Sequence, residues 1–190
     1  RQERGLKRDD IVIMYVGRFV PEKGLSLLLR CFEELASSYQ KIKLILVGDG
    51  LLRKSIQDMI RNGTGNVEIW EPCGHPDMPL VFNCADLLVL PSRFEATPLA
   101  VLEALACGVP VVASKVGDLP KIIIDGVNGY LVKEQTESAF VRAIEHAIAG
   151  LEKLSSEQCI NSVKPYFISN VVPQILDVYL QAWQETQKMV

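Results

Sequence analysis

Two basic residues share one short loop, where they could bind an anion. Residues 17 to 24 read GRFVPEKG and follow an apolar run. Gly17 lets the backbone approach a ligand closely, and Arg18 and Lys23 place two positive charges beside the start of the next helix. Helix N-termini favour anions through their free N–H groups and dipole. Either residue alone would more often be a solvated surface charge, but the pair suits a diphosphate.

Two glutamates separated by seven residues form the second candidate group. Glu95 lies in a loop just before a helix expected over residues 98–107, with Pro98 in its first turn and Thr97 as its cap. Glu103 falls about five residues into that helix, roughly 7 Å along the axis, among apolar neighbours where a carboxylate is unfavourable. Helix N–H groups would then bind a diphosphate, Glu103 the ribose hydroxyls and Glu95 the sugar. The alternative is that Glu103 faces solvent.

Other motifs support no further chemistry. The sequence Gly-Asp-Gly at 48–50 lacks the third glycine of a dinucleotide fingerprint, so a tight turn explains it equally well and no nicotinamide site is predicted. His75 and His146 have no second ligand at a suitable spacing, and Cys73 beside His75 lacks partners. A metal site is therefore not expected.

These residues follow a regular alternation of strands and helices. Near-continuous apolar runs indicate strands that are buried on both faces of a parallel sheet; they cover residues 11–16, 43–47, 67–70, 87–90 and 110–113. Amphipathic segments between them predict crossover helices; these cover residues 24–39, 50–62, 78–84, 98–107 and 135–150. The predicted fold is an α/β, Rossmann-like, doubly wound parallel sheet with helices on both faces. Its strand ends would gather the candidate residues at one edge.

The pattern changes towards both ends of the chain. Glycine and Asp/Asn clusters between residues 114 and 132 predict two tight turns, a helical turn and a small returning strand. Residues 151–163 and 170–189 read as helices broken at Lys164-Pro165. We therefore expect three parts: a solvated lead-in or linker over 1–10, a nucleotide-sugar-binding Rossmann-like domain over 11–150, and helices over 151–190 that pack on this domain or toward a partner domain.

Composition narrows the class of protein further. The formal net charge of -3 offers no basic field for a nucleic acid. The five cysteines are odd in number and have no CxxC spacing, which favours free thiols in a reducing, cytoplasmic compartment. No apolar run approaches the roughly 20 residues of a membrane span, and residues 1–10 have no apolar core of a signal peptide. Peripheral association with the inner face of a membrane stays open.

The order of these motifs resembles the C-terminal, donor-binding domain of retaining glycosyltransferase family 4, of the GT-B architecture. The similarity covers nearly all of residues 11–150 and rests on YVGRFVPEKG, LILVGDG, ADLLVLPSRFEATPLAVLEALACGVPVVASKVGDLP and DGVNGYLV. It implies transfer of a sugar from a nucleoside-diphosphate donor, a UDP-, GDP- or ADP-sugar, to an acceptor hydroxyl with retained configuration. It implies no cofactor and no required metal.

The resemblance also assigns roles to individual residues. Arg18 and Lys23 would bind the donor diphosphate beside Gly17, with backbone groups of the segment Thr97, Pro98, Leu99 and Ala100 completing the phosphate site. Glu95 would contact the transferred sugar as the catalytic residue, and Glu103 the ribose. The loop around Cys73 would line the base pocket. The sequence departs from the family pattern at three positions, with Glu71 and Asp118 in place of common glycines and Lys121 in place of a frequent glutamate.

The same resemblance implies that an N-terminal, acceptor-binding domain is missing from these residues. The 190-residue chain would then bind nucleotide without turning over a sugar. Two other functions fit the same residues: a non-catalytic nucleotide-sugar-binding module, and a sugar-nucleotide epimerase of the same architecture.

Overall fold

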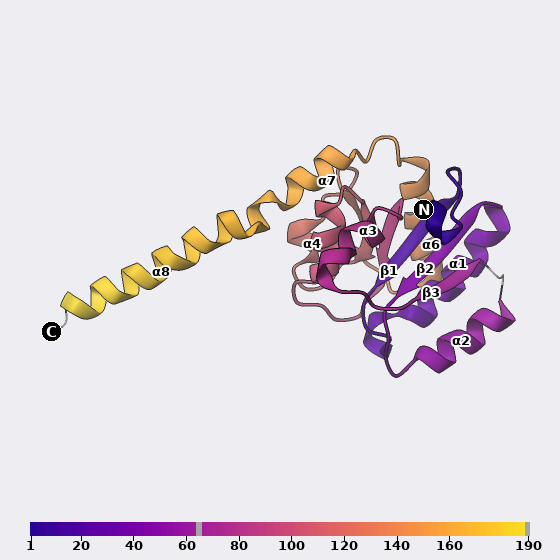
Figure 1. Cartoon of the computed structure of the whole chain (residues 1–190), viewed down its shortest axis with the longest axis horizontal. Helices are drawn as coiled ribbons and strands as arrows, with labels where there is room; N and C mark the ends of the chain where they lie inside the picture. Colours follow the sequence, from indigo (N-terminus) through magenta and orange to yellow (C-terminus); the bar gives the residue numbers. More distant parts are fainter. Residues whose placement is uncertain (64–65, 189–190) are drawn as a thin grey trace.

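The computed structural model describes residues 1–63 and 66–188, without the side chain of Lys188. Its centre is a six-stranded sheet in the order β3-β2-β1-β4-β5-β6, in which every pairing is parallel. Helices connect successive strands and pack around the sheet (Figure 1). The predicted Rossmann-like, doubly wound fold is confirmed. Its strand order reverses between β1 and β4, which is where such sheets bind ligands.

The strands coincide closely with the apolar runs of the sequence. Their bounds are β1 Ile11–Val16, β2 Ile42–Val47, β3 Val67–Trp70, β4 Leu87–Leu90, β5 Val111–Ser114 and β6 Gly129–Val132. The register pairs Ile13 of β1 with Leu44 of β2 on one side and Leu87 of β4 on the other. The small strand expected before residue 132 is β6, a full member of the sheet that runs parallel to β5.

The crossover helices lie where the amphipathic segments predicted them, with ends shifted by at most three residues, and α5 lies at the predicted helical turn. Their bounds are α1 Leu25–Ser38, α2 Arg53–Asn62, α3 Met78–Phe82, α4 Leu99–Ala106, α5 Leu119–Ile122 and α6 Glu137–Ala149. Single 3-10 turns precede some of them: η2 Pro21–Lys23 before α1 and η3 His75–Asp77 before α3. Helix α6 packs against α1, while α3 packs against α4.

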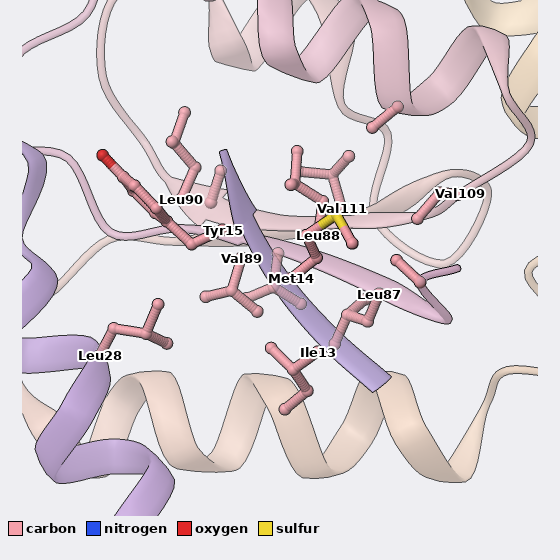
Figure 2. Close-up of a cluster of buried hydrophobic side chains, with 14 of the residues drawn as sticks. Ile13, Met14, Tyr15, Leu28, Leu87, Leu88, Val89, Leu90, Val109 and Val111 are labelled. Carbon is pink, nitrogen blue, oxygen red and sulfur yellow. The ribbon is translucent and has the colours of Figure 1, made fainter. Parts of the chain in front are cut away.

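The core is built around the two central strands. Ile13, Met14 and Tyr15 of β1 are fully buried, and so are the side chains of β4 and the first residues of β5. Figure 2 shows these side chains interleaved above and below the sheet, with Leu28 of α1 reaching them from one side. Strands that are apolar on both faces fix the sheet rigidly, so the loops at its edge start from well-defined positions.

The lead-in differs from the expectation of a solvated segment. Leu6 is buried, the Arg4 guanidinium lies over the Trp70 ring, and Arg1 forms an ion pair with Asp86 at 2.6 Å. A single leucine among charged residues gives no apolar periodicity, so the sequence pattern did not reveal this packing. Residues 1–10 are thus held against the body by contacts with two strand regions. The 3-10 turn η1 Gln2–Arg4 lies within them.

The C-terminal helices behave differently from one another. Helix α7 (Ser156–Val163) packs against α4, whereas α8 (Ile168–Lys188) projects away from the body (Figure 1). The turn η4 Lys164–Tyr166 joins them at the predicted break. Many apolar side chains of α8 are exposed, among them Tyr179 and Trp183. The predicted helix reached residue 189, which lies outside the described residues. No described helix is long and apolar enough to cross a membrane.

Candidate functional site

The loops that follow the strands meet at the carboxyl edge of the sheet. Those after β1, β2 and β3 surround a pocket of about 330 Å³. Its lining is mostly apolar and consists of Val16, Gly17, Arg18, Val47, Gly48, Asp49, Pro72, Cys73 and Met78. Of the predicted site residues, Gly17, Arg18 and Cys73 thus lie together at one pocket. An open apolar slot of this kind can hold a flat ring.

Arg18 is an exposed residue that lines this pocket. Its side chain is exposed, and its carbonyl oxygen accepts a hydrogen bond of 2.9 Å from the buried Tyr15 hydroxyl. Burial raises the pKa of Tyr15, and the nearby Glu95 carboxylate raises it further. Tyr15 therefore donates as a neutral phenol and fixes the loop backbone. The Arg18 guanidinium has no side-chain partner among residues 1–63 and 66–188 and can meet an anion.

Lys23 and Glu95 form an ion pair that the sequence alone did not reveal. Lys23 Nζ donates to Glu95 Oε1 at 2.6 Å, and the two side chains are only 19% and 7% exposed. Gly24 makes this approach possible: its φ is +71°, and a Cβ there would lie 2.1 Å from the carbonyl oxygen of Pro91. The end of β4 and the loop after β1 are thus packed backbone against backbone.

The start of α4 offers donors, although not through the predicted cap. Thr97 does not cap the helix, because Pro98 occupies the cap position and Thr97 precedes it. Pro98 has no N–H to donate, and the Thr97 hydroxyl donates to Asp118 Oδ2 at 2.7 Å. No acceptor within residues 1–63 and 66–188 receives the backbone N–H groups of Leu99 and Ala100. These two groups are therefore available to an anion beside Glu95.

Glu103 is not simply solvated on the outer face of α4. Its side chain is 27% exposed, and Oε1 lies 3.3 Å from Nδ1 of His75. Burial raises the pKa of Cys107 one turn further on, and the Glu103 carboxylate adds to this rise. His75 lies two residues after Cys73 of the pocket, so Glu103 contacts the β3–α3 connection that also contributes to the pocket. Sequence analysis found no role for His75, and its contact with α4 has no local signal.

The titratable residues of the described ranges form no metal centre. Within the described ranges, no three His, Cys, Asp or Glu side chains lie together as a metal ion would require. The five cysteines are free thiols, of which Cys31, Cys84 and Cys159 are buried and Cys73 is exposed.

The fold and this edge together define a Rossmann-like α/β domain that carries cations, carboxylates and free N–H groups near the carboxyl edge of its sheet. The chain belongs to the family described as glycosyl transferases group 1, whose model matches residues 1–162. The predicted resemblance to GT-B glycosyltransferases is confirmed at the level of this family.

Curated relatives support this membership. A D-inositol 3-phosphate glycosyltransferase of Segniliparus rotundus is 35% identical over 81% of this chain and 36% of its own length. A lipopolysaccharide 1,2-N-acetylglucosaminetransferase of Salmonella typhimurium is 32% identical over 80% of this chain and 43% of its own length. The chain thus spans less than half the length of these relatives.

Solved structures show the same fold. Sucrose-phosphate synthase from Thermosynechococcus elongatus superposes with a TM-score of 0.88 at 26% identity, covering 97% of this chain and 48% of the other. HepE from Anabaena, solved in complex with UDP-glucose, superposes with a TM-score of 0.81 at 24% identity, covering 95% of this chain and 51% of the other.

Proposed function

We propose that this chain is the donor-binding, C-terminal domain of a retaining, family 4 glycosyltransferase. The whole protein would transfer a sugar from a nucleoside-diphosphate sugar to an acceptor hydroxyl. One observation carries the proposal: the loops after β1, β3 and β4 bring three groups to the same edge of the sheet as the free N–H groups of α4. These groups are Arg18 at the pocket, the Lys23–Glu95 pair, and Glu103 beside His75. Membership of the group 1 family supports the reaction class.

Each part of the donor has a matching group at this edge. The base enters the apolar pocket near Cys73, and the ribose hydroxyls donate to the Glu103 carboxylate. The diphosphate meets the N–H groups of Leu99 and Ala100 together with the Arg18 and Lys23 side chains. Pro98 shapes this segment without donating. Glu95 then faces the sugar from a position close to Lys23.

The chemistry that these groups can supply is stabilisation of the departing diphosphate. Breaking the bond between sugar and phosphate leaves negative charge on the phosphate oxygens. Fixed cations and helix N–H groups stabilise such developing charge without reorganising. These residues supply that charge themselves, so we propose that the step needs no metal. Glu95 stays beside the sugar to stabilise the positive charge that develops there.

The acceptor half of the enzyme is proposed to lie outside these 190 residues. The relatives are more than twice as long as the matched region, and α8 exposes an apolar face that includes Ile168, Tyr179 and Trp183. We propose that α8 packs against that further domain. Free thiols such as Cys31 and Cys73 favour a cytoplasmic location for the whole protein.

Calorimetric titration of the chain with UDP, GDP and ADP tests the donor site. HepE makes UDP the first nucleotide to try, because it has the same fold and was solved with UDP-glucose. One of the three should bind more tightly than its nucleoside. Arg18→Ala should weaken diphosphate binding by about 1 to 3 kcal/mol and leave the nucleoside affinity unchanged. Binding of none of the three, or equal losses for nucleotide and nucleoside, would contradict the proposal.

Turnover assays separate the alternatives. This chain alone should transfer no sugar, whereas the full-length protein should glycosylate an acceptor. A full-length protein that binds donor without transfer would be a non-catalytic module. Release of the epimerised donor without acceptor would identify an epimerase.

A further inference from the structure

The loop after β5 lies directly against the loop that carries Glu95. Gly117 has a φ of +55°, and a Cβ there would lie 2.2 Å from the carbonyl oxygen of Glu95 and 2.6 Å from that of Ala96. The Asp118 N–H donates to the Ala96 carbonyl oxygen at 3.0 Å. A side chain at position 117 would push the two loops apart, so the contact depends on glycine.

Asp118 continues this contact through its side chain. Thr97 Oγ1 donates to Asp118 Oδ2 at 2.7 Å, and Lys121 Nζ donates to the other oxygen at 2.6 Å. Both hydrogen bonds lower the pKa of Asp118, and the bond from Lys121 has the larger effect. The carboxylate is therefore ionised near neutral pH, and both of its oxygens are engaged. Asp118 thus holds the β4–α4 loop at two successive residues, Ala96 through its N–H and Thr97 through its carboxylate.

The segment held in this way is the one that matters for the donor. Glu95 lies two residues before Thr97, and the free N–H groups of Leu99 and Ala100 lie two and three residues after it. A free carboxylate this close to a diphosphate would repel it. The Lys121 ammonium balances that charge on the side away from Thr97.

We propose that Asp118 is a positioning residue for the donor site: it fixes the β4–α4 loop so that the α4 N–H groups and Glu95 keep the geometry that a diphosphate sugar needs. This inference rests on the proposed function.

Four single variants of the chain, and the double variant that combines Asp118→Ala with Thr97→Val, test the inference. Asp118→Ala removes the acceptor, Thr97→Val removes the donor, and Asp118→Asn keeps a carbonyl that can accept from Thr97. Asp58→Ala is the matched control, because Asp58 also pairs with a cation three residues later, Arg61, but lies on α2 away from the site. The first measurement is amide hydrogen exchange of residues 94–100, which needs no ligand. The second is the affinity for UDP, GDP and ADP and for their nucleosides.

Asp118→Ala and Thr97→Val should each speed amide hydrogen exchange in residues 94–100. Each should also lower the affinity for the nucleoside diphosphate roughly 3- to 10-fold, the scale of one hydrogen bond. Nucleoside affinity should not change. The double variant should be no weaker than Asp118→Ala, since both remove the same bond. Asp118→Asn should retain most of the affinity, and Asp58→Ala all of it.

Unchanged hydrogen exchange in Asp118→Ala and Thr97→Val would overturn the inference. Faster exchange combined with an equal loss of affinity for the nucleoside diphosphate and for the nucleoside would overturn it as well. If Asp118→Ala does not fold, Thr97→Val and Asp118→Asn decide the same question. Failure of the unmodified chain to bind any of the three nucleotides is a separate result that refutes the proposed function itself.

Discussion

Replacing Lys23 with methionine removes one partner of a largely buried ion pair. Methionine keeps most of the apolar stem but leaves the Glu95 carboxylate, which is 7% exposed, without its cation. Removing one partner of a fully buried pair costs about 3 to 5 kcal/mol. Because the lysine side is 19% exposed and water screens it, we expect the free energy of unfolding to fall by about 2 kcal/mol.

Thermal unfolding followed by circular dichroism measures this loss. A chain of this size loses roughly 2 to 4 °C per kcal/mol, so the Tm of Lys23→Met should fall by about 4 to 8 °C. Lys121→Met is the control: it breaks a pair of the same length, 2.6 Å, but that lysine is 75% exposed, and its Tm should change by no more than about 1 °C. Adding Glu95→Gln to Lys23→Met should restore part of the loss, because no unpaired carboxylate remains. Equal shifts for the two single lysine variants would refute the electrostatic account of the Lys23–Glu95 pair.

Three further predictions concern ribose recognition, loop packing and a buried thiol. Glu103→Gln should fold normally but lose most of its preference for UDP over 2′,3′-dideoxy-UDP in calorimetry, since an amide accepts more weakly; unchanged preference would exclude the ribose role. Gly24→Ala should lower the free energy of unfolding in urea by about 2 kcal/mol more than Gly126→Ala: both have positive φ, but only Gly24 faces a carbonyl within 4 Å. Burial raises the pKa of Cys31 to about 12, above the roughly 8.5 of an exposed thiol. The Cys31 thiol therefore ionises at a lower pH in the unfolded state than in the folded state. The free energy of unfolding of the unsubstituted chain, compared with that of Cys31→Ala, should fall as the pH rises from about 9 toward 12; a difference that does not change with pH would contradict this.

The sheet and the position of the site were predictable because their signals are local. Apolar runs give the strands directly, and parallel strands bring the loops after them to one edge. Arg18, Lys23 and Glu95 follow those strand ends, and Glu103 lies in the helix after one of them, so the fold places all four near the same edge of the sheet. The roles of these residues in binding and catalysis stay predictions.

The contacts within the site were not predictable, because they join residues far apart in the sequence. Lys23 and Glu95 are 72 positions apart, and Thr97 and Asp118 are 21 apart. The expected cap was wrong because the helix begins at Leu99, one residue later than predicted, so that Pro98 takes the cap position and Thr97 lies outside the helix, bonded to Asp118. Leu6 likewise lacked the apolar neighbours that would mark a buried segment.

Backbone amide NMR of the chain titrated with UDP, GDP and ADP tests the central claim most directly. The donor-site account predicts that the nucleotide that binds shifts the amide signals of Gly17, Leu99, Ala100 and Glu103 most strongly, with smaller changes around Cys73. Shifts concentrated instead at Leu25 to Leu27, beside the separate pocket that Arg30 and Arg93 line, would contradict it and place the nucleotide elsewhere on the domain.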